Sequence, residues 1–135
     1  MNLIFNVLGK PYGKQRPRYG KYGIYDPQTN KAYEKRVKAA FYDAAGHHFK
    51  PVSTPVALII TIYFQPPKSV SKQVYHDMID GKVYPTHKPD IDNCVKSIMD
   101  GLNGVAYEDD KQVVAIVVNK AYSTESKVTI NFGEV

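Results

Sequence analysis

The stretch KPDIDNCVKSIMDGLNGVAYEDD, residues 88–110, is the most distinctive part of this 135-residue chain. Six of the thirteen carboxylates of the chain lie between Asp90 and Asp110, and Lys96 is the only base among them. Carboxylates at this density repel one another unless something neutralises them. A divalent cation does so well, because Mg²⁺ favours oxygen ligands and is often held by only one or two carboxylates. The stretch therefore predicts an acidic region that binds metal.

The middle of this stretch has the spacing of an amphipathic helix. Apolar residues recur at i, i+3, i+4 and i+7 and form one stripe, consisting of Val95, Ile98, Met99 and Leu102. Pro89 blocks extension upstream, and Asp90 or Asp92 can cap the start. The residues that mark the end are Gly101, Asn103 and Gly104.

The polar face of this helix carries the acidic residues. Asp92, Lys96 and Asp100 are four residues apart, so they share a face away from the apolar stripe. Asp90 and Asp92 are therefore expected at the helix entrance, with Lys96 one turn further in. Acidic residues in this position commonly do no more than cap a helix and complement its dipole, which is the plainer interpretation.

A second acidic pair, Asp109 and Asp110, precedes the apolar run QVVAIVV at residues 112–118. The chain could bring the entrance of this strand back beside the start of the helix and so form an acidic pocket with one lysine. An Asp-Asp pair before a strand is usually only a solvated turn. The combination of D-x-D-N-x-x-K, an apolar helical face and a second acidic pair is much more specific than any one of these features.

The run KPDIDNCVKSIMDGLNGVAYEDDKQVV, residues 88–114, resembles the RusA family of Holliday junction resolvases. The family pattern has a D-x-D, a lysine four residues after its second aspartate, and an aspartate that is second in an Asp-Asp pair. The resemblance implies that the catalytic residues are Asp90, Asp92, Lys96 and Asp110, and that the three aspartates bind Mg²⁺, with Mn²⁺ as a possible substitute. It also implies a homodimer that cuts two opposed strands of a four-way DNA junction in recombination and repair.

The length predicts one domain over residues 1–135. The hydrophobic share of 43% excludes a chain that is disordered throughout. The single cysteine, Cys94, allows no internal disulfide and is expected to be a small buried thiol. No run approaches the roughly 18 apolar residues of a membrane span, and the start of the chain lacks the features of a signal peptide. We therefore expect a cytoplasmic protein without a membrane partner.

The net charge of +5 is unevenly distributed along the chain. Residues 1–50 carry ten Lys and Arg against three Asp and Glu, whereas residues 51–135 carry eight against ten. A basic half beside an acidic pocket suits a polyanion that is gripped at one place and cut at another. A merely solvated basic surface is the alternative.

The segment GKPYGKQRPRYGKYGIYDP, residues 9–27, reads as a loop in which basic residues alternate with tyrosines. Basic groups can neutralise phosphates, and tyrosine rings can stack on bases or sugars. We therefore assign DNA binding to five of its residues: Lys14, Arg16, Arg18, Tyr19 and Lys21. The alternative is an ordinary loop whose tyrosines fold back as packing.

The remaining elements follow from hydrophobic periodicity. Strands are predicted at Asn2–Leu8, Val56–Phe64, about Gln112–Ala121 and Lys127–Phe132, and a further helix from Asn30 to about Ala45. The apolar run Val56–Phe64 is typical of a central strand that is buried on both faces. The turn at residues 123–126 indicates an antiparallel hairpin of the last two strands. The order β-α-β-α-β-β predicts an α+β (mixed α/β) domain with helices packed on a small mixed sheet.

The segment Ser69–Thr86 fits none of these patterns, and its histidines and aspartates match no usual zinc spacing. We interpret it as a mobile excursion that leads into the acidic stretch, where it could act as a lid or a DNA clamp.

The function that we expect is metal-dependent phosphodiester hydrolysis. Asp90, Asp92 and Asp110 would bind one or two Mg²⁺, and Lys96 would add positive charge where the transition state gathers negative charge. Lys96 could instead form a salt bridge that orders the carboxylates. Two other functions stay open: a less selective nuclease for flaps or other branched DNA, and a protein that binds nucleic acid without cutting it.

Overall fold

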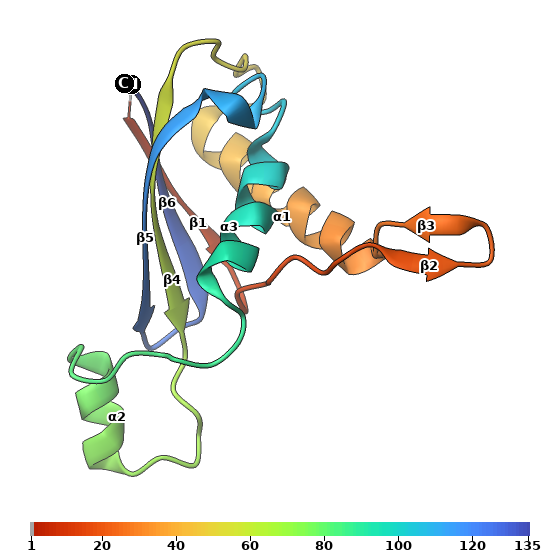
Figure 1. Cartoon of the computed structure of the whole chain (residues 1–135). Coiled ribbons are helices and arrows are strands. Elements are labelled where there is room, and N and C mark those ends of the chain that lie inside the picture. Colours follow the sequence, from red (N-terminus) through yellow and green to blue (C-terminus); the bar gives the residue numbers. More distant parts are fainter. Residues whose placement is uncertain (1) are drawn as a thin grey trace.

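A four-stranded mixed sheet with the strand order β1-β6-β4-β5 organises the computed structural model, which describes residues 2–135. Its strands are β1 (Asn2–Leu8), β4 (Val56–Phe64), β5 (Val113–Tyr122) and β6 (Lys127–Glu134). The two longer helices, α1 (Gln28–Ala45) and α3 (Ile91–Leu102), lie on the same face of the sheet (Figure 1). The α+β class and the predicted order of these six elements are confirmed.

The face of the sheet under the two helices forms the core. Every second residue of β4 is buried there, as the two-residue period of a strand requires: Val56, Leu58, Ile60, Ile62 and Phe64. The ring of Phe41, on α1, packs edge-on against Phe5 of β1 and Phe132 of β6, with ring centroids 5.5 and 5.9 Å apart. One cluster of side chains therefore joins α1 to both strands.

The opposite face of the sheet is open. β4 is a central strand as predicted, but the prediction that both of its faces are buried is wrong. Ile59 is 49% exposed, and its neighbour on β5, Val117, is 55% exposed. A continuous β-branched run does not reveal on which side the helices lie, and within residues 2–135 both long helices lie on one side.

The predicted hairpin of the last two strands is also wrong, because β4 lies between them. β4 pairs in parallel with β5 and antiparallel with β6. The connection at residues 123–126 crosses the end of β4 and is held there by hydrogen bonds. Ser123 N donates to Phe64 O at 2.9 Å, and Gln65 N donates to Ser126 Oγ at 3.0 Å.

Helices α1 and α3 approach closely at Gly101. A Cβ at this position would lie 2.7 Å from the Cβ of Val37, so a larger residue would push the two helices apart. Gly101 was predicted to mark the helix end, but α3 continues to Leu102, and Gly104, with a φ of 76°, follows shortly after. The buried face of α3 is turned slightly from the predicted stripe and consists of Cys94, Ser97, Ile98, Gly101 and Leu102.

Two segments extend away from this body (Figure 1). Strands β2 (Arg18–Gly20) and β3 (Gly23–Tyr25) form an antiparallel hairpin within the predicted loop, and we call residues 18–25 the finger. The second segment contains α2 (Lys72–Ile79), which lies in the predicted excursion and has no buried residue. Sequence periodicity missed both because neither the short strands nor α2 pack an apolar stripe on the core. In the described part of the chain, no helix is long and apolar enough to cross a membrane.

Candidate active site

Asp90 and Asp92 lie at the start of α3, as predicted, and both are exposed. Asp90 occupies the N-cap position, where an aspartate usually accepts a hydrogen bond from a backbone N–H of the first turn. Its carboxylate makes no such capping bond within the described residues. The oxygens of Asp90 therefore stay available to a ligand.

An open groove separates this helix start from the basic loop. Both carboxylates line the groove, together with four basic side chains, those of Lys14, Arg16, Lys88 and Lys96. Lys96 is exposed and, within residues 2–135, forms no ion pair with Asp90 or Asp92 at 4.0 Å or less. The salt bridge that was the alternative role for Lys96 is thus not formed in the protomer. A phosphate in this groove would meet positive charge and two free carboxylates together.

Lys14, one of the predicted DNA-binding residues, is attached to α3. Its ammonium forms an ion pair with Asp100, and its backbone N donates to Asn93 O at 3.0 Å. The hydrogen bond to Asp100 raises the pKa of Lys14. These contacts fix one wall of the groove against the helix that carries Asp92, so Lys14 positions the loop.

Asp109 and Asp110 lie just before β5, where residues Asp110–Gln112 form the 3₁₀ turn η1. Asp109 caps this turn: its Oδ1 accepts from Lys111 N at 3.1 Å, and its N donates to Gln112 Oε1 at 2.8 Å. The bond from Lys111 N lowers the pKa of Asp109, whereas the adjacent carboxyl group of Asp109 raises the pKa of Asp110. Asp110 is exposed and takes no part in the capping box, so it is the freer carboxylate of the pair.

The two acidic pairs lie at opposite ends of β5. Lys120, near the end of β5, donates to Pro89 O at 3.1 Å, which places the start of α3 beside it. Asp110 precedes Val113, the first residue of the same strand. Between Val113 and Lys120 a strand advances about 23 Å at roughly 3.3 Å per residue. Figure 1 accordingly shows the start of α3 and the start of β5 at opposite ends of the sheet.

The expectation that one protomer gathers all three aspartates in one pocket is therefore wrong. Among residues 2–135, no three His, Cys, Asp or Glu side chains form a group that could hold a metal ion. The reason is the connection after α3, which is packed at the far end of the helix. The buried Tyr107 donates its hydroxyl to Met99 O at 2.9 Å, and Gly104 N donates to Tyr107 O at 2.8 Å. The chain cannot return along α3 to Asp90.

Comparison with known proteins places this geometry in a family. A family model described as Endodeoxyribonuclease RusA matches residues 9–132. The chain belongs to the RusA endodeoxyribonuclease family. The uncharacterized protein YqaN of Bacillus subtilis (strain 168) is 38% identical over 140 residues, which cover 98% of this chain and 96% of YqaN. The RusA match includes the basic loop, the groove and both acidic pairs.

The RusA pattern does not point to Lys120, and our sequence analysis missed it. Lys120 Nζ donates to His87 O at 2.7 Å as well as to Pro89 O, and it lies 5.3 Å from the ring centroid of Phe64. It therefore holds the two carbonyls that lead directly into Asp90. Its position in the strand was the available signal. Side chains alternate between the two faces of a strand, and Lys120 is the one base of β5 on the face toward the helices.

Cys94 is buried as expected, and this burial raises the pKa of its thiol to about 11. The thiol therefore stays protonated at neutral pH and belongs to the core of this RusA-family fold.

Proposed function

We propose that the protein is a Mg²⁺-dependent endonuclease that resolves four-way DNA junctions by paired phosphodiester hydrolysis in recombination and repair. The observation that carries this proposal is the groove in which basic side chains face Asp90 and Asp92. RusA-family membership supplies the reaction class.

The donor set fits a hard divalent cation. Asp90, Asp92 and Asp110 offer exposed carboxylate oxygens, and Asp90 and Asp110 are not used for capping. Mg²⁺ prefers such ligands, and Mn²⁺ accepts the same ones. A bound Mg²⁺ would polarise the scissile phosphate and lower the cost of forming the attacking hydroxide.

The other groove residues act on the DNA directly. Lys96 lies one turn further along α3 than Asp92, so its ammonium can stabilise the negative charge that develops on the phosphate. Arg16 and Lys88 bind the neighbouring phosphates. Arg18, Tyr19 and Lys21, which are exposed on the finger, extend the contact along the DNA.

We also infer that a second copy of the chain completes the site, because Asp110 lies at the far end of β5 from Asp90. β5 is an edge strand, and apolar side chains in its first half are exposed: Val114 at 61%, Ile116 at 40% and Val117 at 55%. A long apolar edge of this kind is normally paired or covered.

Antiparallel pairing of β5 with β5 of the partner would satisfy this edge. A two-fold axis through the middle of the pair places the start of each strand beside the end of the other. Asp110 of one protomer would then approach Asp90 of the partner subunit, which lies beside the end of that strand. Such a dimer has two composite sites related by symmetry, as paired incisions require.

The test is metal-dependent cleavage of three substrates of equal length: a four-way junction, a flap and a linear duplex. We expect cleavage of the junction with Mg²⁺ or Mn²⁺, little cleavage of the duplex, and no cleavage with EDTA. Equal cutting of flap and junction would support the less selective nuclease instead. Binding to DNA without cleavage under any metal would contradict the proposal and support a binding protein.

A further inference from the structure

The base of the finger, residues 18–25, is fastened to the body by one buried amide. Asn30, on α1, is 1% exposed. Its Oδ1 accepts hydrogen bonds from Tyr12 Oη at 2.6 Å and Gln15 N at 2.9 Å. Its Nδ2 donates to Gln15 O at 2.9 Å and Asp26 Oδ1 at 2.8 Å. All four bonding positions of the amide are used, and they fasten the chain both before and after the finger.

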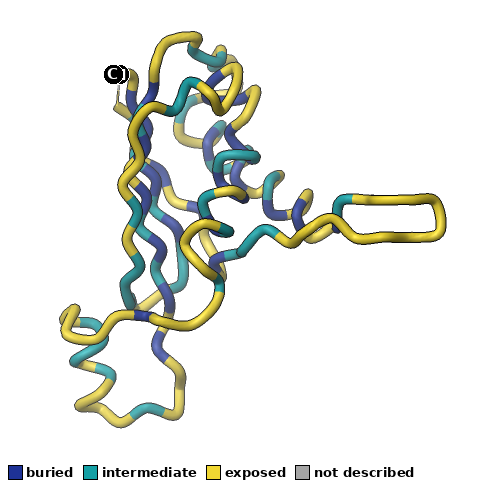
Figure 2. Tube along the Cα trace, viewed as in Figure 1, coloured by how far each residue is buried: buried dark blue, intermediate teal, exposed yellow. Residues whose placement is uncertain are grey.

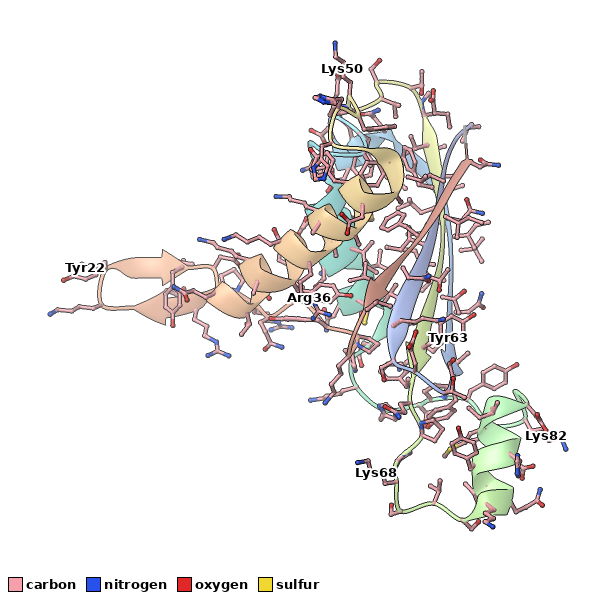
Figure 3. The ribbon with its side chains drawn as sticks, turned by 180° about the vertical axis from the view of Figure 1, so that it is seen from behind. Tyr22, Arg36, Lys50, Tyr63, Lys68 and Lys82 are labelled. Carbon is pink, nitrogen blue, oxygen red and sulfur yellow. The ribbon has the colours of Figure 1, made fainter. Side chains whose placement is uncertain are left out.

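The finger carries apolar side chains outward, away from any core. Tyr19 and Ile24 are partners across the two strands, so they share one face, and they are 86% and 65% exposed. Tyr22, in the turn, is 95% exposed, and Figure 3 shows it at the end of the finger that is farthest from the body. Figure 2 shows that the whole finger is exposed. A projection with exposed aromatic rings, fixed at its base, indicates a binding surface.

The charge of the finger favours a nucleic acid as its partner. The sequence RYGKYGIY contains Arg18 and Lys21 and no acidic residue. The Lys21 ammonium lies 5.8 Å from the ring centroid of Tyr22, so charge and aromatic surface are presented at the same tip. Phosphates attract the charge, and base faces accept the rings.

The position of the finger selects which bases it can reach. Arg16, two residues before the finger, lines the groove that contains Asp90 and Asp92. Tyr22 is the sixth residue after Arg16, so the tip lies within about 20 Å of the groove at roughly 3.3 Å per residue. A continuous duplex hides its base faces by stacking, whereas a branch point exposes some of them. DNA that enters the groove near a branch would bring those bases within reach.

We propose that the finger is a wedge that enters the branch point, with Tyr22 stacked on bases there and Tyr19 and Ile24 packed on the adjoining step. This inference rests on the proposed function, because the wedge needs branched DNA. It adds Tyr22 and Ile24 to the DNA-binding residues and gives the finger the role of recognising branched DNA by its exposed bases.

The test compares Y22A/I24A with the wild-type protein in EDTA, where no cleavage occurs. Base–aromatic stacking contributes enough to expect at least about 10-fold weaker binding to a four-way junction, with duplex binding changed by less than about 2-fold. A 2-aminopurine base at the branch should change its fluorescence on binding of wild-type protein but not of the variant. Ile4→Ala is the control, because Ile4 is 63% exposed on β1, outside both the finger and the groove.

Three results would overturn the wedge: equal loss of junction and duplex binding, no loss of either, or an altered dimerisation constant with DNA binding intact. The last result would make the finger a contact between copies of the chain. Thermal unfolding of the variant shows that the fold is retained. If wild-type protein cleaves junctions but Y22A/I24A causes the same 2-aminopurine fluorescence change as the wild type, only the wedge proposal fails. If wild-type protein shows the signal but never cleaves, only the proposed function fails.

Discussion

Asp109 and Asp90 occupy the same kind of position in the chain but are used differently. Both are N-cap residues, Asp109 of η1 and Asp90 of α3. Asp109 accepts from Lys111 N and shares a capping box with Gln112, whereas the carboxylate of Asp90 makes no capping bond within residues 2–135. Local structure therefore accounts for Asp109 and leaves Asp90 without a structural role. Hydrogen-bond partners distinguish an aspartate that caps a turn from one whose carboxylate stays available to a ligand, where residue type and position do not.

The same comparison applies to the two ends of β5. One end lies beside Asp90, Asp92 and the groove, and the other end follows Asp110. Under the proposed function each end supplies only part of a metal site, so both parts are expected to be essential although they are far apart in one protomer.

The largest effect is expected for Asp90→Asn and Asp92→Asn. We predict that each lowers single-turnover junction cleavage by more than about 100-fold, beyond the usual cost of losing an outer-shell partner. Junction binding in EDTA should be retained, because less negative charge faces the phosphates. Stability should change by less than about 0.5 kcal/mol, since Asp90 caps nothing. Cleavage near the wild-type rate in both variants would remove these residues from the site.

The second prediction separates Asp110 from Asp109. Asp110→Asn should lose cleavage nearly as fully as Asp92→Asn. Asp109→Asn should cleave almost normally, because asparagine also caps helices. Asp109→Ala should lower the melting temperature slightly through loss of the cap, with cleavage retained below that temperature. An inactive Asp109→Asn with an active Asp110→Asn would show that the ligand is Asp109.

A smaller effect is expected for Lys120→Met, which keeps the aliphatic stem but no longer donates to His87 O and Pro89 O. We predict about 10- to 100-fold slower cleavage and a higher Mg²⁺ concentration for half-maximal rate, because the peptide before Asp90 is held less firmly. Lys127→Met is the control, since Lys127 lies on β6 and contacts Glu125 and Tyr63. Unchanged Mg²⁺ dependence in Lys120→Met would reduce Lys120 to a packing role.

The smallest effect is expected in the basic loop. Each phosphate contact adds about 0.9 to the slope of log affinity against log salt. Arg16→Ala with Arg18→Ala should therefore flatten the slope by up to about 1.8 for junction and duplex alike. Lys14→Ala should alter the slope less, because Lys14 is paired with Asp100. A larger change in Lys14→Ala than in the double variant would reverse the assignment of these residues.

Sequence predicted the long elements because each has a strong apolar period that packs on one core. It could not predict the strand order, since the turn at residues 123–126 has the same chemistry whether or not β4 lies between its ends. The finger strands and α2 were not predicted because they bury few apolar side chains and so lack a clear apolar period. The identities of Asp90, Asp92, Lys96 and Asp110 came from local pattern, whereas the distance between them depends on where Tyr107 packs, which is a tertiary contact. Lys120 was missed for the same reason.

The central claim is that each metal site takes carboxylates from two copies of the chain. The most direct test mixes Asp92→Asn protein with Asp110→Asn protein after subunit exchange. If the sites are composite, each mixed dimer has one site with Asp110 from one copy and intact Asp90 and Asp92 from the other. The mixture should then nick one strand of a four-way junction, although neither variant alone cuts. Verified mixed dimers that remain inactive at every ratio would contradict the account.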